Sequence, residues 1–227
     1  MRLREYIIEY NKSSDQEVWL NLKKNCSEII KFYKKMTPPP IGRMFYRFMK
    51  VSIPDYKVFI PPKNREPLSS APWIQKMVDD ALEERFGWRP RSSGVFALSL
   101  YPGLFAPPQE ISDYGKTYMF FPYDGYEYIW SEKISDLYLI FPYSKLDRHY
   151  ADIKKTIMSA SRNETDFEKN LAEWKIKFEE WMDTYRDTGL ENALNVRKGY
   201  EVMFKCKKYV LVNPIFENSI IEKIWVD

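Results

Sequence analysis

A long helical block separates two groups of β-favouring segments, and this order constrains the fold more than any other feature. Between Asp147 and Asn195, apolar residues recur at helical spacing and charged residues occupy the other face. Short runs rich in Val, Ile, Phe and Tyr precede and follow that block. Runs of strands separated by helical blocks favour an α+β fold over a doubly wound parallel sheet. We expect a single domain over residues 1–227.

Two further helices are predicted in the first half of the chain. The first begins at the capping signal Ser13–Glu17 and ends at Pro38–Pro40, because proline cannot continue a helix. Residues 1–40 are therefore expected to form an N-terminal helical segment. The second helix runs from Ala71 to Phe86, with Gly87 at the position of a C-terminal cap.

The strands are predicted from runs of β-branched and aromatic residues. Asp124-Gly125 between two such runs is typical of a tight turn. Residues 52–70 contain several prolines and are predicted to form a loop, and residues 147–196 become a helical insertion between strands. The predicted strands are Ile41–Val51, Val95–Leu100, Thr117–Phe121, Tyr126–Trp130, Gly199–Phe204 and Lys208–Asn213.

The inventory of reactive residues excludes several classes of protein. Two cysteines, Cys26 and Cys206, cannot build a disulfide framework or a four-thiolate zinc site, and His149 is the only histidine. The glycine motifs of dinucleotide-binding folds, P-loops and nucleophile elbows are missing. Any chemistry is thus expected to rest on carboxylates, hydroxyls and arginine, with no metal.

Charge and hydropathy set the expected location. The net charge of +3 is too small to indicate nucleic-acid binding by itself. Neither a signal peptide nor an apolar run of the ~20 residues that a membrane helix needs is visible. We therefore expect a cytoplasmic protein that does not bind membranes. No pattern in the sequence indicates an oligomeric state.

Three polar residues interrupt apolar strand segments. Arg47 lies within an aromatic run, where a guanidinium needs an anionic partner, either an internal carboxylate or a ligand phosphate. Ser99 closes the run that begins at Val95, and a small hydroxyl there is often merely tolerated. Glu201 precedes an apolar run, where a charge facing solvent on an edge strand is the simpler interpretation.

Taken together and in this order, these residues resemble the signature of mono-ADP-ribosyltransferases of the arginine–serine–glutamate class. In that family an arginine follows an aromatic residue on the first core strand, as Arg47 follows Tyr46 here. A Ser/Thr-rich strand comes next, and Phe96–Ser99 takes its place and keeps the last serine. The third motif is a glutamate followed by an apolar strand, a turn and another strand, which matches the segment after Glu201.

The resemblance implies a fold and a biological setting. A group of tailed-phage proteins with this fold is also resembled, in the segments Arg91–Ala97, Tyr114–Tyr118 and Tyr128–Ser131. The implied fold is an ADP-ribosyltransferase-like split β-sheet core with an N-terminal helix and a helical insertion. The implied partners are NAD, consumed as a substrate, and a host protein or nucleic acid that accepts ADP-ribose. A phage-encoded enzyme of this kind would act in the host cytoplasm or be packaged in the virion.

The resemblance also implies roles for single residues. Breaking the nicotinamide–ribose bond passes through an oxocarbenium-like transition state, as glycoside hydrolysis does, and Glu201 would stabilise it. Arg47 would hold the phosphates of NAD, since arginine binds phosphate through paired hydrogen bonds, and Ser99 would position ribose or Arg47. The aromatic residues that would stack on nicotinamide are Tyr46, Tyr114 and Tyr118.

Two alternatives remain open at the level of the sequence. Gly199 stands where family members that modify arginine commonly carry Glu or Gln, and Ala97 replaces the first serine of the second motif. A catalytically inactive relative would retain the same short set of residues, and would serve as a binding module in a virion or as an inhibitor of a host defence enzyme. The second alternative is a two-carboxylate hydrolase that uses Glu127 with Glu201.

Overall fold

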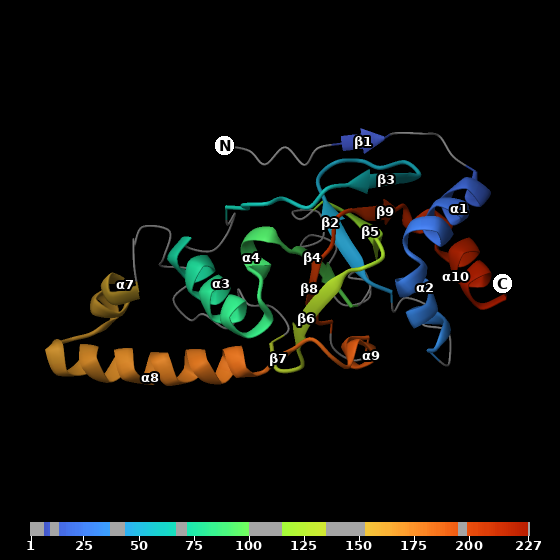
Figure 1. Cartoon of the computed structure of the whole chain (residues 1–227). Helices are drawn as coiled ribbons and strands as arrows, with labels where there is room; N and C mark the ends of the chain where they lie inside the picture. Colours follow the sequence, from blue (N-terminus) through green and yellow to red (C-terminus); the bar gives the residue numbers. More distant parts are fainter. Residues whose placement is uncertain are drawn as a thin grey trace.

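The chain forms an antiparallel sheet with helices gathered at its two ends (Figure 1). This arrangement comes from a computed structural model, and it confirms the α+β class. None of the helices in the described part of the chain is long and apolar enough to cross a membrane. The structure describes residues 7–9, 14–36, 44–66, 72–99, 115–134, 153–194 and 199–226.

The described strands form one sheet in the order β1-β3-β9-β5-β2-β4-β8-β6-β7, and neighbouring strands run antiparallel. Their bounds are β1 Ile7–Glu9, β2 Tyr46–Met49, β3 Tyr56–Phe59, β4 Val95–Leu98, β5 Lys116–Pro122, β6 Glu127–Ser131, β7 Tyr185–Arg186, β8 Glu201–Lys205 and β9 Tyr209–Val212.

The sheet divides into two parts that meet at a narrow junction. β2 pairs with β5 at four positions, whereas the described register joins β2 to β4 at one position, where Tyr46 lies opposite Leu98. We call β1, β3, β9, β5 and β2 the first half-sheet, and β4, β8, β6 and β7 the second half-sheet. The hairpin of β8 and β9 places one strand in each half, with β9 between β3 and β5 and β8 between β4 and β6.

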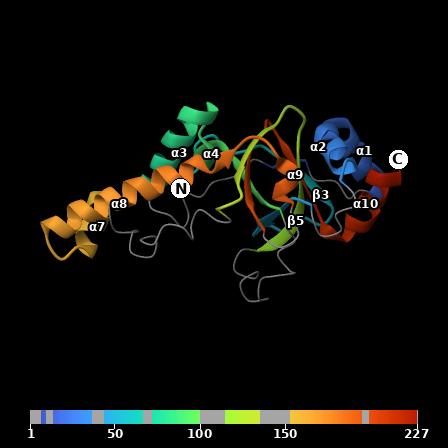
Figure 2. The same cartoon turned by 90° about the horizontal axis from the view of Figure 1, so that it is seen from below.

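The helices form two groups. Helices α1, α2 and α10 lie together at one end of the molecule, and α3, α4, α7 and α8 lie at the other, where α8 leads away from the sheet (Figures 1 and 2). The bounds are α1 Asp15–Asn25, α2 Ser27–Lys34, α3 Pro72–Phe86, α4 Pro90–Ser93, α7 Ile153–Ala160, α8 Glu164–Asp183, α9 Leu190–Ala193, the 3-10 helix η3 Pro214–Phe216 and α10 Glu217–Val226.

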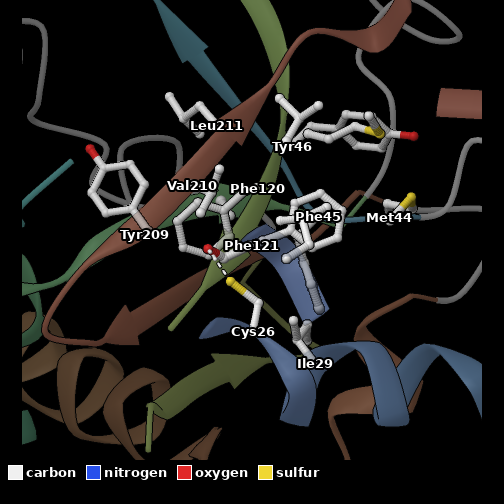
Figure 3. Close-up of a cluster of buried hydrophobic side chains, with 14 of the residues drawn as sticks. Cys26, Ile29, Met44, Phe45, Tyr46, Phe120, Phe121, Tyr209, Val210 and Leu211 are labelled. Atoms are coloured by element: carbon white, nitrogen blue, oxygen red, sulfur yellow. Dashed lines mark hydrogen bonds between the residues drawn. The ribbon is translucent and has the colours of Figure 1, made fainter. Parts of the chain in front are cut away.

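Two apolar cores correspond to these two groups. In the first core, aromatic residues of the sheet such as Phe45 and Phe121 pack against Ile29 and Cys26 (Figure 3). The Cys26 thiol lies 3.8 Å from the carbonyl oxygen of Phe121. Each fully buried aromatic of this kind stabilises the fold by about 1.5–3 kcal/mol. These contacts fix α1 and α2 on the first half-sheet.

The second core joins α3 and α8 to the second half-sheet. Trp73 of α3 meets Trp174 of α8 edge-on, with ring centroids 6.4 Å apart, and Trp174 stacks on Phe178. Ile129 and Met203 contribute the sheet side of this cluster, and both are fully buried. The position of α3 matters for the site described below, because α3 supports α4.

The predicted N-terminal helix is present, although it is broken into two. Its capping signal is confirmed, since the Ser14 hydroxyl accepts from the Glu17 backbone and the Glu17 carboxylate accepts from the Ser14 backbone. Cys26 separates α1 from α2, because its backbone leaves the helical conformation at φ −129° and ψ 33°. The prediction of one continuous helix was therefore wrong at this residue.

The predicted turn at Asp124-Gly125 is confirmed, and it has a second role. Gly125 adopts φ +76°, which suits glycine, and the turn joins β5 to β6. The Asp124 carboxylate accepts hydrogen bonds from the Ser27 hydroxyl at 2.7 Å and the Glu28 amide at 2.8 Å. This turn therefore caps the start of α2, which lies far away in sequence.

Several other elements differ from the prediction. The segment predicted as a loop contains β3, whose four residues pair with β9 in the first half-sheet. The predicted helical insertion is interrupted by β7, which pairs with β6, and Leu190 beyond it is buried in the first core. Helix α10 was not predicted, although Ile220 and Ile224 follow its buried face. His149 lies outside the described residues.

Candidate functional site

The three residues singled out in the sequence lie on neighbouring strands. Arg47 belongs to β2, Ser99 directly follows β4, and Glu201 begins β8. The Ser99 amide donates to the carbonyl of Tyr200 at 3.0 Å, and the Ser99 hydroxyl accepts from the Tyr200 amide at 2.8 Å. Ser99 is fully buried, so its hydroxyl fixes the backbone that leads into Glu201.

Arg47 and Glu201 point to opposite faces of the sheet. The register places Tyr46 opposite Leu98 and Leu98 opposite Glu201, so these three side chains share one face. Arg47 follows Tyr46 and therefore projects from the other face. Its Nη1 donates to the carbonyl oxygen of Phe96 at 2.8 Å, which ties β2 to β4 beside their narrow junction. The register therefore places Arg47 and Glu201 of the predicted site on opposite faces of the sheet.

A different arginine contacts Glu201. Nη1 of Arg91, in the short helix α4, lies 3.2 Å from Oε1 of Glu201. The two side chains are 15% and 16% exposed, so water screens this ion pair less than it screens a surface pair. Both charges still reach solvent, which leaves the pair open to exchange with a ligand.

The guanidinium of Arg91 also lies over the aromatic ring of Phe96 in β4. The guanidinium of Arg91 is 4.5 Å from the centre of the Phe96 ring, and that of Arg65 is 3.8 Å from the same centre. Both distances fall within the range of cation–π contacts, with the closest approach at Arg65. We call Arg65, Arg91, Phe96 and Glu201 the arginine site.

A buried hydrogen-bond network from α3 fixes the backbone of the arginine site. Asp79 has no exposed surface, and it accepts from the amides of Arg91 at 2.6 Å and Ser92 at 3.3 Å as well as from the Ser92 hydroxyl. Gln75 donates to the carbonyl of Arg65 and to the Ser92 hydroxyl. These contacts hold α4 in a defined position relative to α3.

The loop that carries Arg65 is bound to α4 in turn. The Arg65 amide donates to the carbonyl of Ser92 at 2.8 Å, and Nη2 of Arg65 donates to the carbonyl of Arg91 at the same distance. Two segments 26 residues apart in sequence are therefore held as one unit. The two guanidiniums are positioned by the fold rather than by a ligand.

Two of the three tyrosines predicted to stack on nicotinamide, Tyr46 and Tyr118, are not open to a ligand. Tyr46 is fully buried and donates to Glu217 of α10 at 2.6 Å, and burial together with Glu217 raises the pKa of Tyr46 above its ordinary value. Tyr118 is also buried, and its hydroxyl donates to Val51 and accepts from Ile53. Tyr114 lies outside the described residues. Tyr46 and Tyr118 are therefore not part of the proposed site.

The structure does not support the pairing of Glu127 with Glu201. Glu127 is exposed and forms an ion pair with Lys205 at 2.8 Å, and it lies opposite Lys205 in the register. Lys205 is four residues from Glu201 along β8, a distance of about 13 Å at the rise of a strand. This exceeds the ~5–9.5 Å that separates the two carboxylates of a glycosidase.

The cysteines and the acidic residues show no second reactive centre in the described part of the chain. Burial raises the pKa of the Cys206 thiol to about 12 although nearby Arg47 lowers it, and burial also raises the pKa of Cys26. Both thiols are therefore protonated at neutral pH. Among the described residues, no three His, Cys, Asp or Glu side chains gather as a metal site requires.

The sequence reasoning missed Arg65, Arg91 and the network beneath them. A signal for Arg91 was present, because two arginines flank a proline directly before a strand. Nothing comparable marks Arg65, whose partners are distant in sequence. No family model matches the chain, and none of the curated proteins or solved structures compared with it is similar enough to count as a match.

Proposed function

We propose that the protein is an NAD-dependent ADP-ribosyltransferase whose catalytic carboxylate is Glu201. One observation carries the proposal: the Ser99 hydroxyl holds the Tyr200 amide next to Glu201, where β4 ends and β8 begins, and Arg47 lies on β2, which joins β4 at a narrow junction. This order of residues over neighbouring strands is what the resemblance to the arginine–serine–glutamate class implies. An ADP-ribosyltransferase-like split sheet is part of the same proposal.

The chemistry needs a carboxylate near the ribose of NAD. The bond between C1′ of the ribose and the nicotinamide nitrogen breaks, and its electron pair leaves with nicotinamide. Glu201 lies at the start of β8, where its negative charge stabilises the positive charge that develops on the ribose. A nucleophilic atom of the acceptor then bonds to C1′ and gives up a proton to solvent.

The described residues do not identify the molecule that accepts ADP-ribose. We propose a host protein or nucleic acid as the acceptor, as the resemblance to phage proteins implies. Gly199, two residues before Glu201, carries no side chain that would orient an arginine acceptor. The phosphate-holding role of Arg47 stays a prediction, because its described hydrogen bond is to the backbone of Phe96.

The direct test follows nicotinamide release and label transfer. The purified chain is incubated with NAD labelled in the adenylate half, with and without a bacterial lysate. We expect release of nicotinamide and labelling of a macromolecule, and a loss of about 10²–10³-fold in Glu201→Gln. Glu127→Gln is the matched control, since Glu127 is exposed and distant, and it is expected to leave the rate unchanged.

A second candidate function is a binding module that has this fold without catalysis. The favouring observation is that Glu201 is held by Arg91, while Arg47 and the Ser99 hydroxyl contact neighbouring backbone. If neither the parent chain nor Glu201→Gln releases nicotinamide, although the parent binds NAD, the transferase proposal fails and the binding module remains.

A further inference from the structure

We propose that the exposed side of helix α2 binds the phosphate backbone of a double-stranded nucleic acid through Lys31, Lys34 and Lys35. We call these three residues the lysine face. Lys23 and Lys24 lie in the last turn of α1, shortly before α2 begins, and add to the positive charge at this end of the molecule. Binding at the lysine face goes beyond the proposed transferase activity and does not depend on it.

Helical spacing brings the three lysines together. Lys34 and Lys35 lie three and four residues after Lys31, so both are its neighbours on the helix surface, with about 5–6 Å between Cβ atoms. Lys35 is the C-cap of α2 and keeps helical dihedral angles. All three side chains are exposed, because Ile29 and Ile30 turn the other side of α2 into the first core. The lysine face is therefore one continuous patch of positive charge on a fixed helix.

Within the described part of the chain, the lysine face has no carboxylate at ion-pair distance. Acidic side chains at this end of the molecule have other partners. Glu17 caps the start of α1, the Glu28 carboxylate accepts from the Gly125 amide at 2.8 Å, and Glu217 accepts from the Tyr46 hydroxyl. The lysine charges are therefore balanced by solvent ions, which a phosphate backbone would replace.

Charge is distributed unevenly between the two ends of the molecule, although the net charge of the whole chain is small. Helices α1 and α2 with the C-cap of α2 carry five lysines and three acidic residues. Helix α8, at the opposite end, carries seven acidic residues and three lysines (Figure 1). Such an asymmetry orients the molecule in the field of a polyanion, with α2 toward it and α8 away from it.

A nucleic acid fits the lysine face better than an anionic membrane does. A helix that lies on a membrane inserts its apolar side below the lipid head groups, whereas the apolar side of α2 is buried in the first core. Leu20 is the large apolar side chain that α1 and α2 expose, and a single leucine offers little area for insertion. Lysine is a flexible point charge that meets phosphates without reading bases, so binding should not depend on base sequence.

The experiment measures binding of the full chain to a short fluorescent DNA duplex by anisotropy, between about 50 and about 200 mM salt. We expect the logarithm of the binding constant to fall linearly with the logarithm of the salt concentration, equally for two duplexes of unrelated sequence. The variant with Lys31, Lys34 and Lys35 all replaced by Gln should show a slope smaller by about 2–3, because each lysine–phosphate contact contributes about 0.9. Its affinity at the lowest salt should fall by at least about tenfold.

Three further variants serve as controls. The matched one replaces Lys169, Lys175 and Lys177 of α8 by Gln, which removes the same charge from exposed positions at the acidic end, and it should bind DNA as the parent does. Replacement of the lysine face by three arginines keeps the charge and should preserve binding. Glu201→Gln should also bind as the parent does, since the proposed catalytic carboxylate has no part in this contact.

Other results would overturn the proposal. These are no DNA binding by the parent at about 50 mM salt, or an equal loss of affinity in the α8 variant and the lysine-face variant. Binding to phosphatidylserine vesicles but not to DNA, lost in the lysine-face variant, would assign the face to a membrane instead. DNA binding without NAD cleavage contradicts the transferase alone, whereas NAD cleavage without DNA binding contradicts the lysine face alone.

Discussion

Replacement of Asp79 by alanine should destabilise the protein strongly, because Asp79 is the buried acceptor on which α4 depends. Its carboxylate has no exposed surface and accepts from the amides of Arg91 and Ser92 and from the Ser92 hydroxyl. Each buried donor that loses its acceptor costs about 1–3 kcal/mol. The Ser92 hydroxyl can rotate and also contacts Gln75, so the costs of the three lost hydrogen bonds will not add fully. We expect the free energy of unfolding to fall by about 3–5 kcal/mol.

The assay is equilibrium unfolding in urea, followed by tryptophan fluorescence. With a slope of about 2–3 kcal/mol per molar urea, the expected loss lowers the midpoint by about 1–2 M. Asp79→Asn should lie between the parent and Asp79→Ala, since the amide oxygen still accepts from one backbone amide. The matched control is Asp183→Ala, because the Asp183 carboxylate is 79% exposed and lies 3.5 Å from Arg85. We expect that control to change the free energy by at most about 1 kcal/mol.

A shift of less than about 0.5 kcal/mol in Asp79→Ala would refute the reasoning, since surface substitutions fall in that range. It would mean that water replaces the carboxylate at no cost and that α4 is not held by α3. An equal loss in Asp183→Ala and Asp79→Ala would point the same way, because burial would then have no bearing on the cost.

Two further predictions concern the backbone and the thiols. Gly115→Ala should destabilise by more than about 2 kcal/mol, because Gly115 has φ +100° and a methyl group there would lie 2.3 Å from the carbonyl oxygen of Met49. Gly125→Ala, at φ +76° with open space around it, should cost only about 1–2 kcal/mol in the same urea assay, and equal losses would contradict this. Cys206 should react with a thiol reagent at pH 8 on the order of 10³-fold more slowly than in the unfolded chain, because burial raises its pKa to about 12. Arg47→Gln should slow the reaction further, since Arg47 lowers that pKa, and a faster reaction in this variant would disprove their proximity.

Much of the secondary structure could be predicted where local chemistry determines it. The capping box at Ser14, the Asp124-Gly125 turn and the β-favouring runs that give β5 and β6 all depend on residues close in sequence. β3 was missed because prolines on either side suggest a loop, and its stability comes from pairing with β9 about 150 residues later. Tertiary pairing of this kind leaves little local signal.

The candidate site could be predicted only in part for the same reason. The order of Arg47, Ser99 and Glu201 over neighbouring strands follows from motif order and sheet topology. The face on which each side chain lies depends on register, and a shift of one residue reverses it. The contact of Arg91 with Glu201 joins residues 110 positions apart through a turn whose geometry Asp79 sets. No pattern within one segment carries that information.

The hairpin of β8 and β9 has a consequence for how the chain is made. Each of its strands is central rather than peripheral, so until residues 201–212 have left the ribosome, β3 and β5 lack the strand between them, and so do β4 and β6. Four strand edges with apolar side chains then lack partners that are synthesised later. Insertion of this hairpin completes the strand pairing of both half-sheets at once. Nascent chains stalled before residue 201 should therefore be prone to aggregate or to require chaperones.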